Sequence, residues 1–168
     1  QIAVPVLISV LQDLRQEAMV RHEAAEALGA IAAEDTICIL EKYSSDDVVE
    51  VAETCQLALD RMKWLQEQHG ETNNPYKSVD PAPPYTAKSL WELKDILLDE
   101  TAPLFNRYRA MFALRNIHTQ DSILALCLAL RKGSALFRHE IAFVLGQMQD
   151  ASSIPYLTDS LGDASENE

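Results

Sequence analysis

The segment Val20-Arg-His-Glu-Ala-Ala-Glu-Ala-Leu-Gly29 recurs in the second half of the chain as Phe137-Arg-His-Glu-Ile-Ala-Phe-Val-Leu-Gly146. Each copy carries Arg-His-Glu from its second position and ends in Leu-Gly, and two of the four histidines of the chain lie in these copies. A recurrence of this length predicts a repeated structural unit, and a repeat determines the fold before any other sequence feature does.

Four segments share the apolar positions of this motif, with a period of about 30 residues within each half of the chain: residues 20–31, 49–60, 106–117 and 137–148. Shorter apolar patterns lie before, between and after them at residues 4–11, 36–43, 123–130 and 154–161. Pro5 and Pro155 suit the first turn of two of these shorter helices. Pairs of short helices at a fixed period, without the alternation typical of strands, predict an all-α superhelix of stacked, HEAT-like helical hairpins.

Residues 70–87 interrupt the repeat. Four of the seven prolines lie here, and Gly70 is expected to follow a helix that ends at His69. Such a proline content favours an extended, semi-rigid connection. We therefore expect the C-terminal part of a first repeat array over residues 1–69, a linker over 70–87 and the N-terminal part of a second array over 88–168.

The net charge of −12 argues against a nucleic acid as partner, because a phosphate backbone attracts basic proteins. It favours a cationic protein or an amine-bearing substrate, and ordinary acidic solubility explains it equally well. The longest apolar run, residues 123–130, is far shorter than the ~20 residues of a membrane helix. We expect a soluble, cytoplasmic protein without a membrane partner, with reduced and buried thiols at Cys38, Cys55 and Cys127.

The repeated His-Glu pairs are the candidate functional residues. On a helix the apolar residues of each copy form one stripe, and His22 and His139 fall on the opposite side. We expect both imidazoles, with the neighbouring carboxylates of Glu23 and Glu140, to project into the groove of the superhelix. Imidazole and carboxylate together suit iron, zinc or manganese. The alternative is that each histidine is an ordinary surface residue or a polar residue satisfied within the fold.

A glycine follows each of these histidines after seven residues, at Gly29 and Gly146. Because glycine in mid-helix costs about 1 kcal/mol relative to alanine, we expect it to provide clearance beside the pair or to allow a close helix contact. We expect the remaining histidines, His69 and His118, to be solvated. The acidic residues within 46–53 are interpreted as a charge preference at the start of a helix.

The chain resembles the deoxyhypusine hydroxylase family of HEAT-repeat, non-haem di-iron monooxygenases. The resemblance covers essentially the whole chain. It is carried by Met19-Val-Arg-His-Glu-Ala-Ala-Glu-Ala-Leu-Gly-Ala-Ile31, Val51-Ala-Glu-Thr-Cys-Gln-Leu-Ala58, Ser78-Val-Asp-Pro-Ala-Pro-Pro84, Arg107-Tyr-Arg-Ala-Met-Phe-Ala-Leu-Arg-Asn116 and Gly133-Ser-Ala-Leu-Phe-Arg-His-Glu140. It implies O₂-dependent hydroxylation of the deoxyhypusine residue of a translation initiation factor to hypusine, at two Fe(II) ions held between two four-repeat domains.

By this resemblance His22, His139 and Glu140 ligate iron, while Glu23 lies near the metal and holds the ammonium group of the substrate. Each domain of the family contributes two His-Glu motifs, and the phase of the repeat puts the other two just outside the 168 residues. We therefore expect a central fragment that lacks half of the ligands and is inactive by itself. The alternative is a non-catalytic HEAT-repeat scaffold that binds a basic protein.

Overall fold

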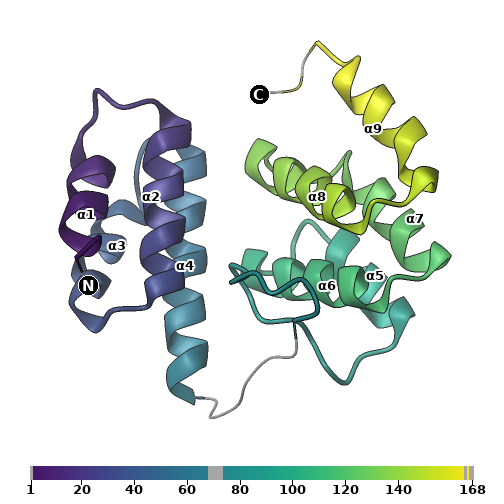
Figure 1. Cartoon of the computed structure of the whole chain (residues 1–168), viewed down its shortest axis with the longest axis horizontal. Coiled ribbons are helices and arrows are strands. Elements are labelled where there is room, and N and C mark those ends of the chain that lie inside the picture. The colour runs from purple at the N-terminus through teal and green to yellow at the C-terminus, as the bar shows by residue number, and fades with distance from the viewer. Residues whose placement is uncertain (1, 68–73, 165, 167–168) are drawn as a thin grey trace. The chain divides into compact units, whose positions relative to one another are not determined.

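The computed structural model describes residues 2–67, 74–164 and 166, and every regular element in this part of the chain is a helix (Figure 1). The predicted all-α fold is thereby confirmed, and none of these helices is long and apolar enough to cross a membrane. In chain order the elements are α1 (Val4–Gln12), α2 (Ala18–Ile31), the 3-10 turn η1 (Glu34–Thr36), α3 (Ile37–Tyr43), α4 (Val49–Glu67), α5 (Leu90–Leu98), α6 (Leu104–Ile117), α7 (Gln120–Ala129), α8 (Ala135–Met148), the 3-10 turn η2 (Ala151–Ser153) and α9 (Ile154–Leu161).

The described residues form two compact units. Residues 2–67 and 79–82 belong to the first unit, and residues 74–78, 83–164 and 166 belong to the second. The stretch 74–89, which contains no helix or strand, is therefore shared between them. The predicted boundaries of the arrays and the linker stay a prediction, and the helix end expected at His69 and Gly70 lies outside the described residues.

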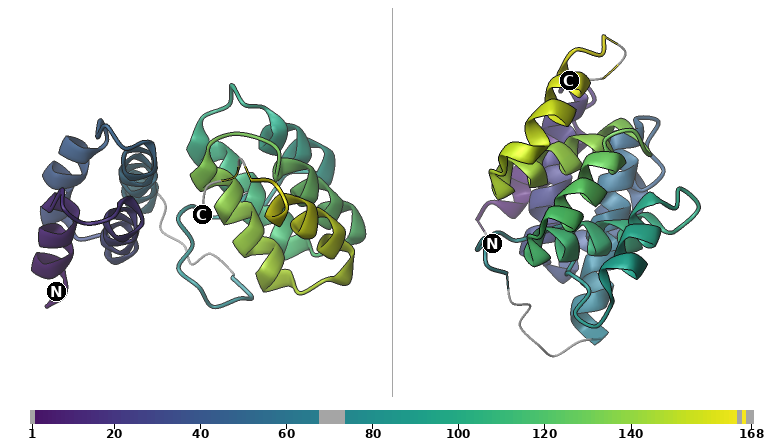
Figure 2. Two further views of the ribbon diagram at one scale, coloured as in Figure 1. Left: turned by 90° about the horizontal axis from the view of Figure 1, so that it is seen from above. Right: turned by 90° about the vertical axis from the view of Figure 1, so that its right-hand side faces the viewer.

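In the first unit α1 and α3 form one layer, and α2 and α4 form the other (Figures 1 and 2). Its core lies between the layers and includes Leu11, Leu28 and Leu40, all fully buried. Helices α2 and α4 approach each other closely, because a Cβ atom at Gly29 would lie only 2.6 Å from the Cβ atom of Ala58. A tight helix contact, one of the two explanations considered for this glycine, therefore accounts for Gly29.

In the second unit α6 and α8 lie side by side, and α5 and α7 pack against them as the other layer (Figures 1 and 2). The apolar stripe predicted for α8 is confirmed, since Phe137, Ile141, Val144, Leu145 and Met148 are all buried. The side of α8 opposite this stripe carries Phe143, which is 54% exposed. The second helix of each hairpin thus turns its apolar stripe towards the first helices, as the repeat pattern indicated.

Helices α2, α6 and α8 end in the same way. Each is closed by a residue in the left-handed conformation, with φ of 54° at Ala32, 51° at His118 and 52° at Gln149. All three of these residues stand at the same distance from the arginine that opens the motif. Helix α4 instead continues to Glu67. Pro5 and Pro155 lie in the first turns of α1 and α9, as predicted.

The arginine of the repeat fastens the two helices of a hairpin together. The Nε atom of Arg21 donates to the carbonyl oxygen of Leu11 at 3.0 Å, and the Nε atom of Arg107 donates to that of Leu97 at 3.0 Å. Both acceptors lie in the last turn of the preceding helix, where carbonyl groups have no partner within their own helix. Because both arginine side chains are buried, this position of the motif is structural.

One expectation needs correction, that of the three thiols. Helix α5 lies within the array expected over residues 88–168, and Ser89 and Glu92 form the capping box that begins it. The thiols of Cys55 and Cys127 are buried as predicted, and burial disfavours their thiolates and raises the pKa of Cys55 to about 12 and that of Cys127 to about 11. Cys38 is exposed instead, because it lies on the outer side of the short helix α3.

Candidate functional site

The imidazole of His22 is buried, with only 2% of the residue accessible to solvent. It lies on the side of α2 that α4 covers, and its Nδ1 atom is 3.5 Å from the hydroxyl oxygen of Thr54. The prediction that His22 projects into an open groove is therefore wrong. Because α4 packs beside α2, the side opposite the apolar stripe is an interface as well, and Val20 and Ile31 at the ends of that stripe are 43% and 41% exposed.

Glu23 places its carboxylate beside this ring. Its Oε1 atom lies 3.6 Å from the Nε2 atom of His22, and its side chain is 66% exposed. Two ligands at about 2.1 Å from one first-row metal ion lie about 3.0–3.4 Å apart. A small movement of the exposed Glu23 side chain is enough for both atoms to reach one ion, so the donor types and their spacing fit a metal.

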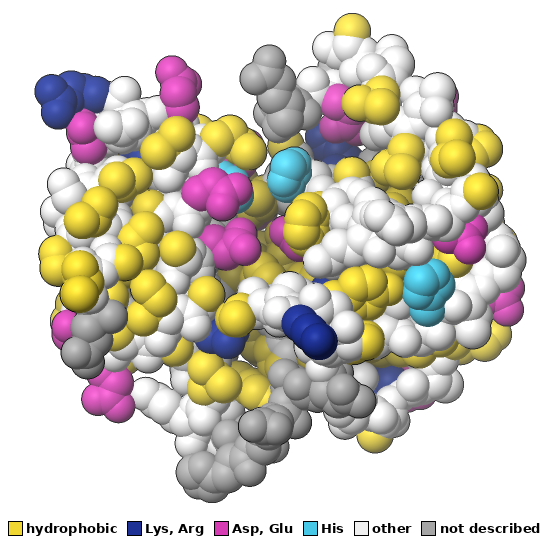
Figure 3. Space-filling view, viewed as in Figure 1, with side chains coloured by type: hydrophobic (Ala, Val, Ile, Leu, Met, Phe, Trp, Pro, Cys, Tyr) yellow, Lys and Arg dark blue, Asp and Glu magenta, His cyan; other side chains and the backbone are white. Residues whose placement is uncertain are grey.

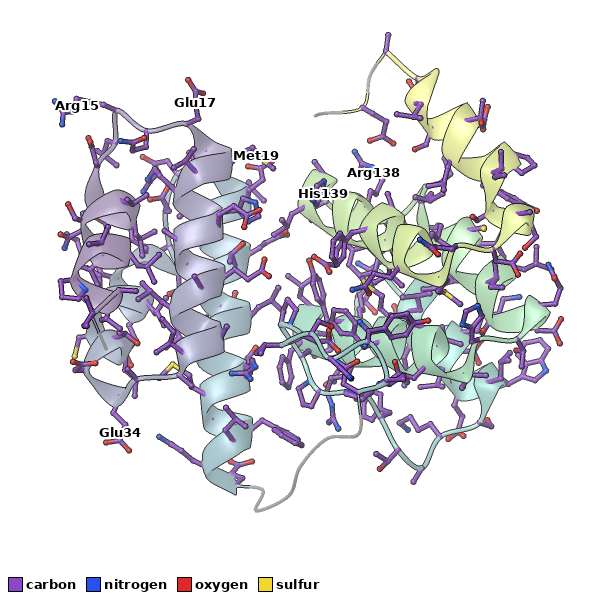
Figure 4. All side chains as sticks on the ribbon, viewed as in Figure 1. Arg15, Glu17, Met19, Glu34, Arg138 and His139 are labelled. Carbon is purple, nitrogen blue, oxygen red and sulfur yellow. The ribbon has the colours of Figure 1, made fainter. Side chains whose placement is uncertain are left out.

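The second pair has the opposite exposure. His139 is exposed, which agrees with the predicted side of the helix, and Glu140 is only 9% exposed. Figure 4 labels His139 and Arg138 in the first half of α8. His139 lines a pocket of about 490 Å³ between α8 and α9, whose apolar wall includes Ala142, Leu157 and Leu161. With respect to the described residues, the imidazole of His139 is open to a ligand.

The two histidines differ because their helices have different neighbours. Helix α4 covers the His22 flank of α2. Tyr108 occupies the same motif position in α6, and its ring meets Phe137 of α8 with the centroids 5.7 Å apart. Among the described residues, no helix follows α8 in the layer that α6 and α8 form. The flank of α8 that carries His139 and Gly146 therefore has no neighbouring helix of that layer. A Cβ atom at Gly146 would accordingly meet nothing within 4 Å.

The glutamates follow the same rule on the other flank. Successive helical residues are turned by about 100°, so each glutamate lies away from the flank of its histidine. In α8 this second flank is next to α6, and Glu140 is buried there. Among the described residues, no helix precedes α2 in the layer that α2 and α4 form, and Glu23 is exposed on that flank. The stacking order alone therefore accounts for the reversed exposure of the two pairs.

Further carboxylates surround the first pair. Glu26 lies one turn after His22 in α2, and the pKa of its carboxyl is raised by burial and by the nearby charges of Glu23 and Asp80. Figure 3 shows acidic side chains on the visible face of the first unit. The negative potential beside His22 favours a metal cation or an ammonium group. Glu26 follows His22 by four residues and therefore lies on the same helix face, whereas Asp80 is distant in the sequence and no local pattern connects it with this site.

The acidic stretch 46–53 contributes a structural ion pair. The Nη1 and Nη2 atoms of Arg21 donate to the two carboxylate oxygens of Asp46 at 3.2 and 2.5 Å, and both side chains are over nine-tenths buried. The guanidinium of Arg21 holds the pKa of Asp46 below its usual value. Asp46 also accepts from the backbone N–H of Val48 near the start of α4, so the interpretation as a helix-start residue covers only part of its role.

Arg138, the corresponding arginine of the second copy, forms an ion pair that is more exposed to solvent. Its guanidinium pairs with Glu166 at 2.8 Å and donates to the carbonyl oxygen of Gly133 at 2.7 Å. The side chains of Arg138 and Glu166 are 23% and 22% exposed. The two copies of the motif therefore share an ion-paired arginine whose partner is deeply buried only in the first unit.

Neither pair is a complete metal site. In the part of the chain that the structure describes, no three His, Cys, Asp or Glu side chains gather closely enough to hold a metal ion. Each pair offers one imidazole and one carboxylate, and metal sites of this type take at least three protein ligands. His118, at the end of α6, is exposed as predicted and lies 3.2 Å from the hydroxyl of Tyr76, whereas His69 lies outside the described residues.

Comparisons with known proteins show which families share this repeat and this sequence. The model of the PBS lyase HEAT-like repeat family matches residues 20–46, 107–132 and 137–163, which correspond to α2 with α3, α6 with α7, and α8 with α9. Deoxyhypusine hydroxylases of Gallus gallus and Homo sapiens are 59% and 56% identical to the chain. Each comparison covers 98% of this chain and 56% or 55% of the relative.

A solved structure, described as human deoxyhypusine hydroxylase in complex with glycerol, superposes with a TM-score of 0.95 at 56% identity. The match covers 98% of this chain and 58% of that one. A match over 98% of the chain extends through both units. The chain is therefore similar to deoxyhypusine hydroxylases over nearly all of its own residues, and it spans about half the length of the curated relatives that it matches.

Proposed function

We propose that the chain is part of a di-iron enzyme that uses O₂ to hydroxylate the deoxyhypusine residue of a translation initiation factor to hypusine. The observation that carries this proposal is the pair of Arg-His-Glu motifs on equivalent turns of α2 and α8, in a chain 54–59% identical to deoxyhypusine hydroxylases. Because the described residues offer fewer than three ligands at each place, the activity is proposed for a longer protein that supplies further ligands.

His22, His139 and Glu140 are proposed to hold iron, two ions in the complete enzyme. Bound there, iron supplies the activation of O₂, from which one oxygen atom enters a C–H bond of the substrate and the other leaves as water, with two electrons from an external reductant. The exposed carboxylate of Glu23 is proposed to hold the ammonium group of the substrate. The neighbouring Glu26 supports this role, because a second carboxylate strengthens the attraction for a cation.

The proposed partner is a protein, since deoxyhypusine is a residue of a polypeptide, and the net charge of −12 favours the approach of a lysine-derived, cationic side chain. We assign the reaction to the cytoplasm, where translation initiation factors act. A non-catalytic scaffold for a basic protein is less well supported, because that function gives no reason for two equivalent His-Glu pairs.

A chimeric enzyme tests this function. The 168 residues replace the corresponding segment of the human relative, and far-UV circular dichroism compares the helical content of the chimera with that of its parent. We expect two irons per chain and, with O₂ and a reductant, a gain of one oxygen atom on a deoxyhypusine-containing protein by mass spectrometry. A chimera that keeps its helical content but neither binds iron nor oxidises the substrate contradicts the proposal.

Two histidine variants sharpen this experiment. His139→Ala removes an exposed imidazole from the proposed site, and we expect it to abolish hydroxylation and to lower the iron content with little change in helical content. His118→Ala removes another exposed imidazole of the same unit, at the end of α6, and serves as the matched control. Equal loss of iron and activity in both variants means that His139 has no specific role.

A further inference from the structure

We infer that Thr54 is a positioning residue for His22: it fixes the ring tautomer that leaves the Nε2 atom available to a metal ion. The inference rests on the proposed iron site for its functional meaning, but its physical content concerns the metal-free chain. It follows from the contact between α2 and α4, where the Oγ1 atom of Thr54 lies 3.5 Å from the Nδ1 atom of His22.

The hydroxyl proton of Thr54 is already used elsewhere. Thr54 donates it to the carbonyl oxygen of Glu50, one turn earlier in α4, at 2.7 Å. This bond to the carbonyl four residues back is a common arrangement for threonine within a helix. A hydroxyl group has a single proton, so only oxygen lone pairs remain to face His22. Towards the imidazole, Thr54 therefore acts as an acceptor.

An acceptor at this place selects one form of the neutral ring. The Nδ1 atom has to carry the proton to donate to Thr54, and in a neutral imidazole the other nitrogen then has a free lone pair. That nitrogen, Nε2, is the one that lies 3.6 Å from the carboxylate of Glu23. Histidines that bind metals usually donate their second ring N–H to an oxygen, and such partners tune metal affinity.

Burial increases the effect of this contact. His22 is 2% exposed and Thr54 is 5% exposed, so bulk water does not readily replace the hydroxyl as a partner. In the opposite tautomer the lone pair of Nδ1 faces the lone pairs of Oγ1, or else the hydroxyl must give up its bond to Glu50. Both alternatives leave a buried polar group poorly satisfied, which is unfavourable. The carboxylate of Glu23 near Nε2 attracts a proton to that nitrogen and opposes this preference, but its side chain is 66% exposed and solvated. The buried hydroxyl of Thr54 therefore favours the metal-binding form of His22 before any metal is present.

Nuclear magnetic resonance of the metal-free chain tests the inference directly. Ring ¹⁵N chemical shifts of histidine-labelled protein at about pH 8, where an ordinary imidazole is neutral, report which nitrogen carries the proton. We expect His22 to be protonated at Nδ1 in the unsubstituted chain and in Thr54→Ser, which keeps the hydroxyl. In Thr54→Val, a substitution of similar shape without the hydroxyl, we expect a substantial population protonated at Nε2.

The chain contains a matched control. Thr36 is also fully buried in the first unit and also donates to a backbone carbonyl, that of Ala33 at 2.6 Å. Thr36→Val should leave the His22 tautomer unchanged. A ring protonated at Nε2 in the unsubstituted chain overturns the inference, and so does an unchanged tautomer in a folded Thr54→Val. Should that variant not fold, the unsubstituted chain and Thr54→Ser decide the question by themselves.

Iron binding to the chimera gives the second readout. Thr54→Val is expected to weaken Fe(II) binding about 10- to 100-fold, the usual effect of removing such a partner, whereas Thr36→Val is expected to leave it unchanged. Unchanged binding in Thr54→Val removes the functional part of the inference. If no form of the chimera binds iron, the proposed function fails, and the tautomer of the metal-free chain still shows whether Thr54 positions His22.

Discussion

The Arg-His-Glu triplets of α2 and α8 consist of the same residues in the same order, but they bury different members. In α2 the arginine and the histidine are buried and the glutamate is exposed, whereas in α8 the glutamate is buried and the histidine is exposed. Each difference matches the presence or absence of a described helix on one flank. In stacked hairpins, therefore, the neighbouring helix determines the exposure of a motif residue, and the chemistry available at a site depends on which repeats surround it.

The largest predicted difference between the copies concerns their arginines. Arg21→Ala leaves the buried carboxylate of Asp46 without its partner and removes the bond to Leu11, so we expect it to lower the free energy of unfolding of the first unit by about 3–5 kcal/mol. Arg138→Ala breaks a partly exposed pair, and we expect about 1 kcal/mol or less in the second unit. Urea unfolding followed by hydrogen exchange of peptides from each unit measures both values.

The buried pair also predicts a pH dependence for the first unit. Arg21 lowers the pKa of Asp46 in the folded state, so the ionised carboxylate stabilises the fold fully above the ordinary aspartate pKa of about 3.9. This contribution is lost as the pH falls through the lower pKa of the folded state. In Asp46→Asn the stability of the first unit should change less between pH 5 and pH 2 than in the unsubstituted chain. Equal slopes mean that Asp46 does not contribute in this way.

The histidines give the second comparison. His22→Ala empties a buried position between α2 and α4, and we expect a loss of about 2 kcal/mol, as for other truncations inside a packed interface. His139→Ala removes an exposed side chain, and the expected change is within about 0.5 kcal/mol. Thermal unfolding of the two variants ranks them. A larger loss for His139→Ala contradicts the assignment of exposure from the stacking order.

The glycines give the third comparison, and their expected effects have opposite signs. A methyl group at Gly29 meets Ala58 at 2.6 Å, so Gly29→Ala is expected to cost about 1–2 kcal/mol through overpacking. Gly146 has open space around the same position, so Gly146→Ala is expected to gain about 0.5–1 kcal/mol from the higher helix propensity of alanine. Chemical denaturation of the 168-residue chain measures both. Stabilisation by Gly29→Ala would show that α2 and α4 are less closely packed.

The fold could be predicted from the sequence because the repeat is recognised from patterns of residues that lie close together in the chain. The apolar stripe of α8 and the prolines in the first turns of α1 and α9 need no knowledge of distant contacts. The pattern for α5 is weaker, and only the capping box of Ser89 and Glu92 marks its beginning. A helical period predicts where a helix lies and which stripe is apolar, and these are the features that the structure confirms.

The environment of the site could not be predicted in the same way. A helical wheel identifies the side opposite the apolar stripe, but it does not tell whether another hairpin covers that side, and His22 is buried for this reason. The partner of Arg21 is Asp46, which is 25 residues away and belongs to the next hairpin. Thr54 is likewise separated from His22 by 32 residues. Such contacts depend on the register between helices, which a single repeat does not specify.

The arginines that hold the stretch between α4 and α5 have a consequence for substitutions. Arg61 donates to the carbonyl oxygen of Asp80 at 3.1 Å, and Arg109 donates to that of Pro83 at 3.0 Å. A carbonyl oxygen is present whatever side chain its residue bears, so these contacts constrain the path of the main chain and not the identity of residues 80 and 83. A substitution at residue 80 or 83 therefore leaves the acceptor of these bonds in place, whereas loss of Arg61 or Arg109 removes a donor, so the path of this stretch depends on the two arginines more than on the side chains of the residues that they hold.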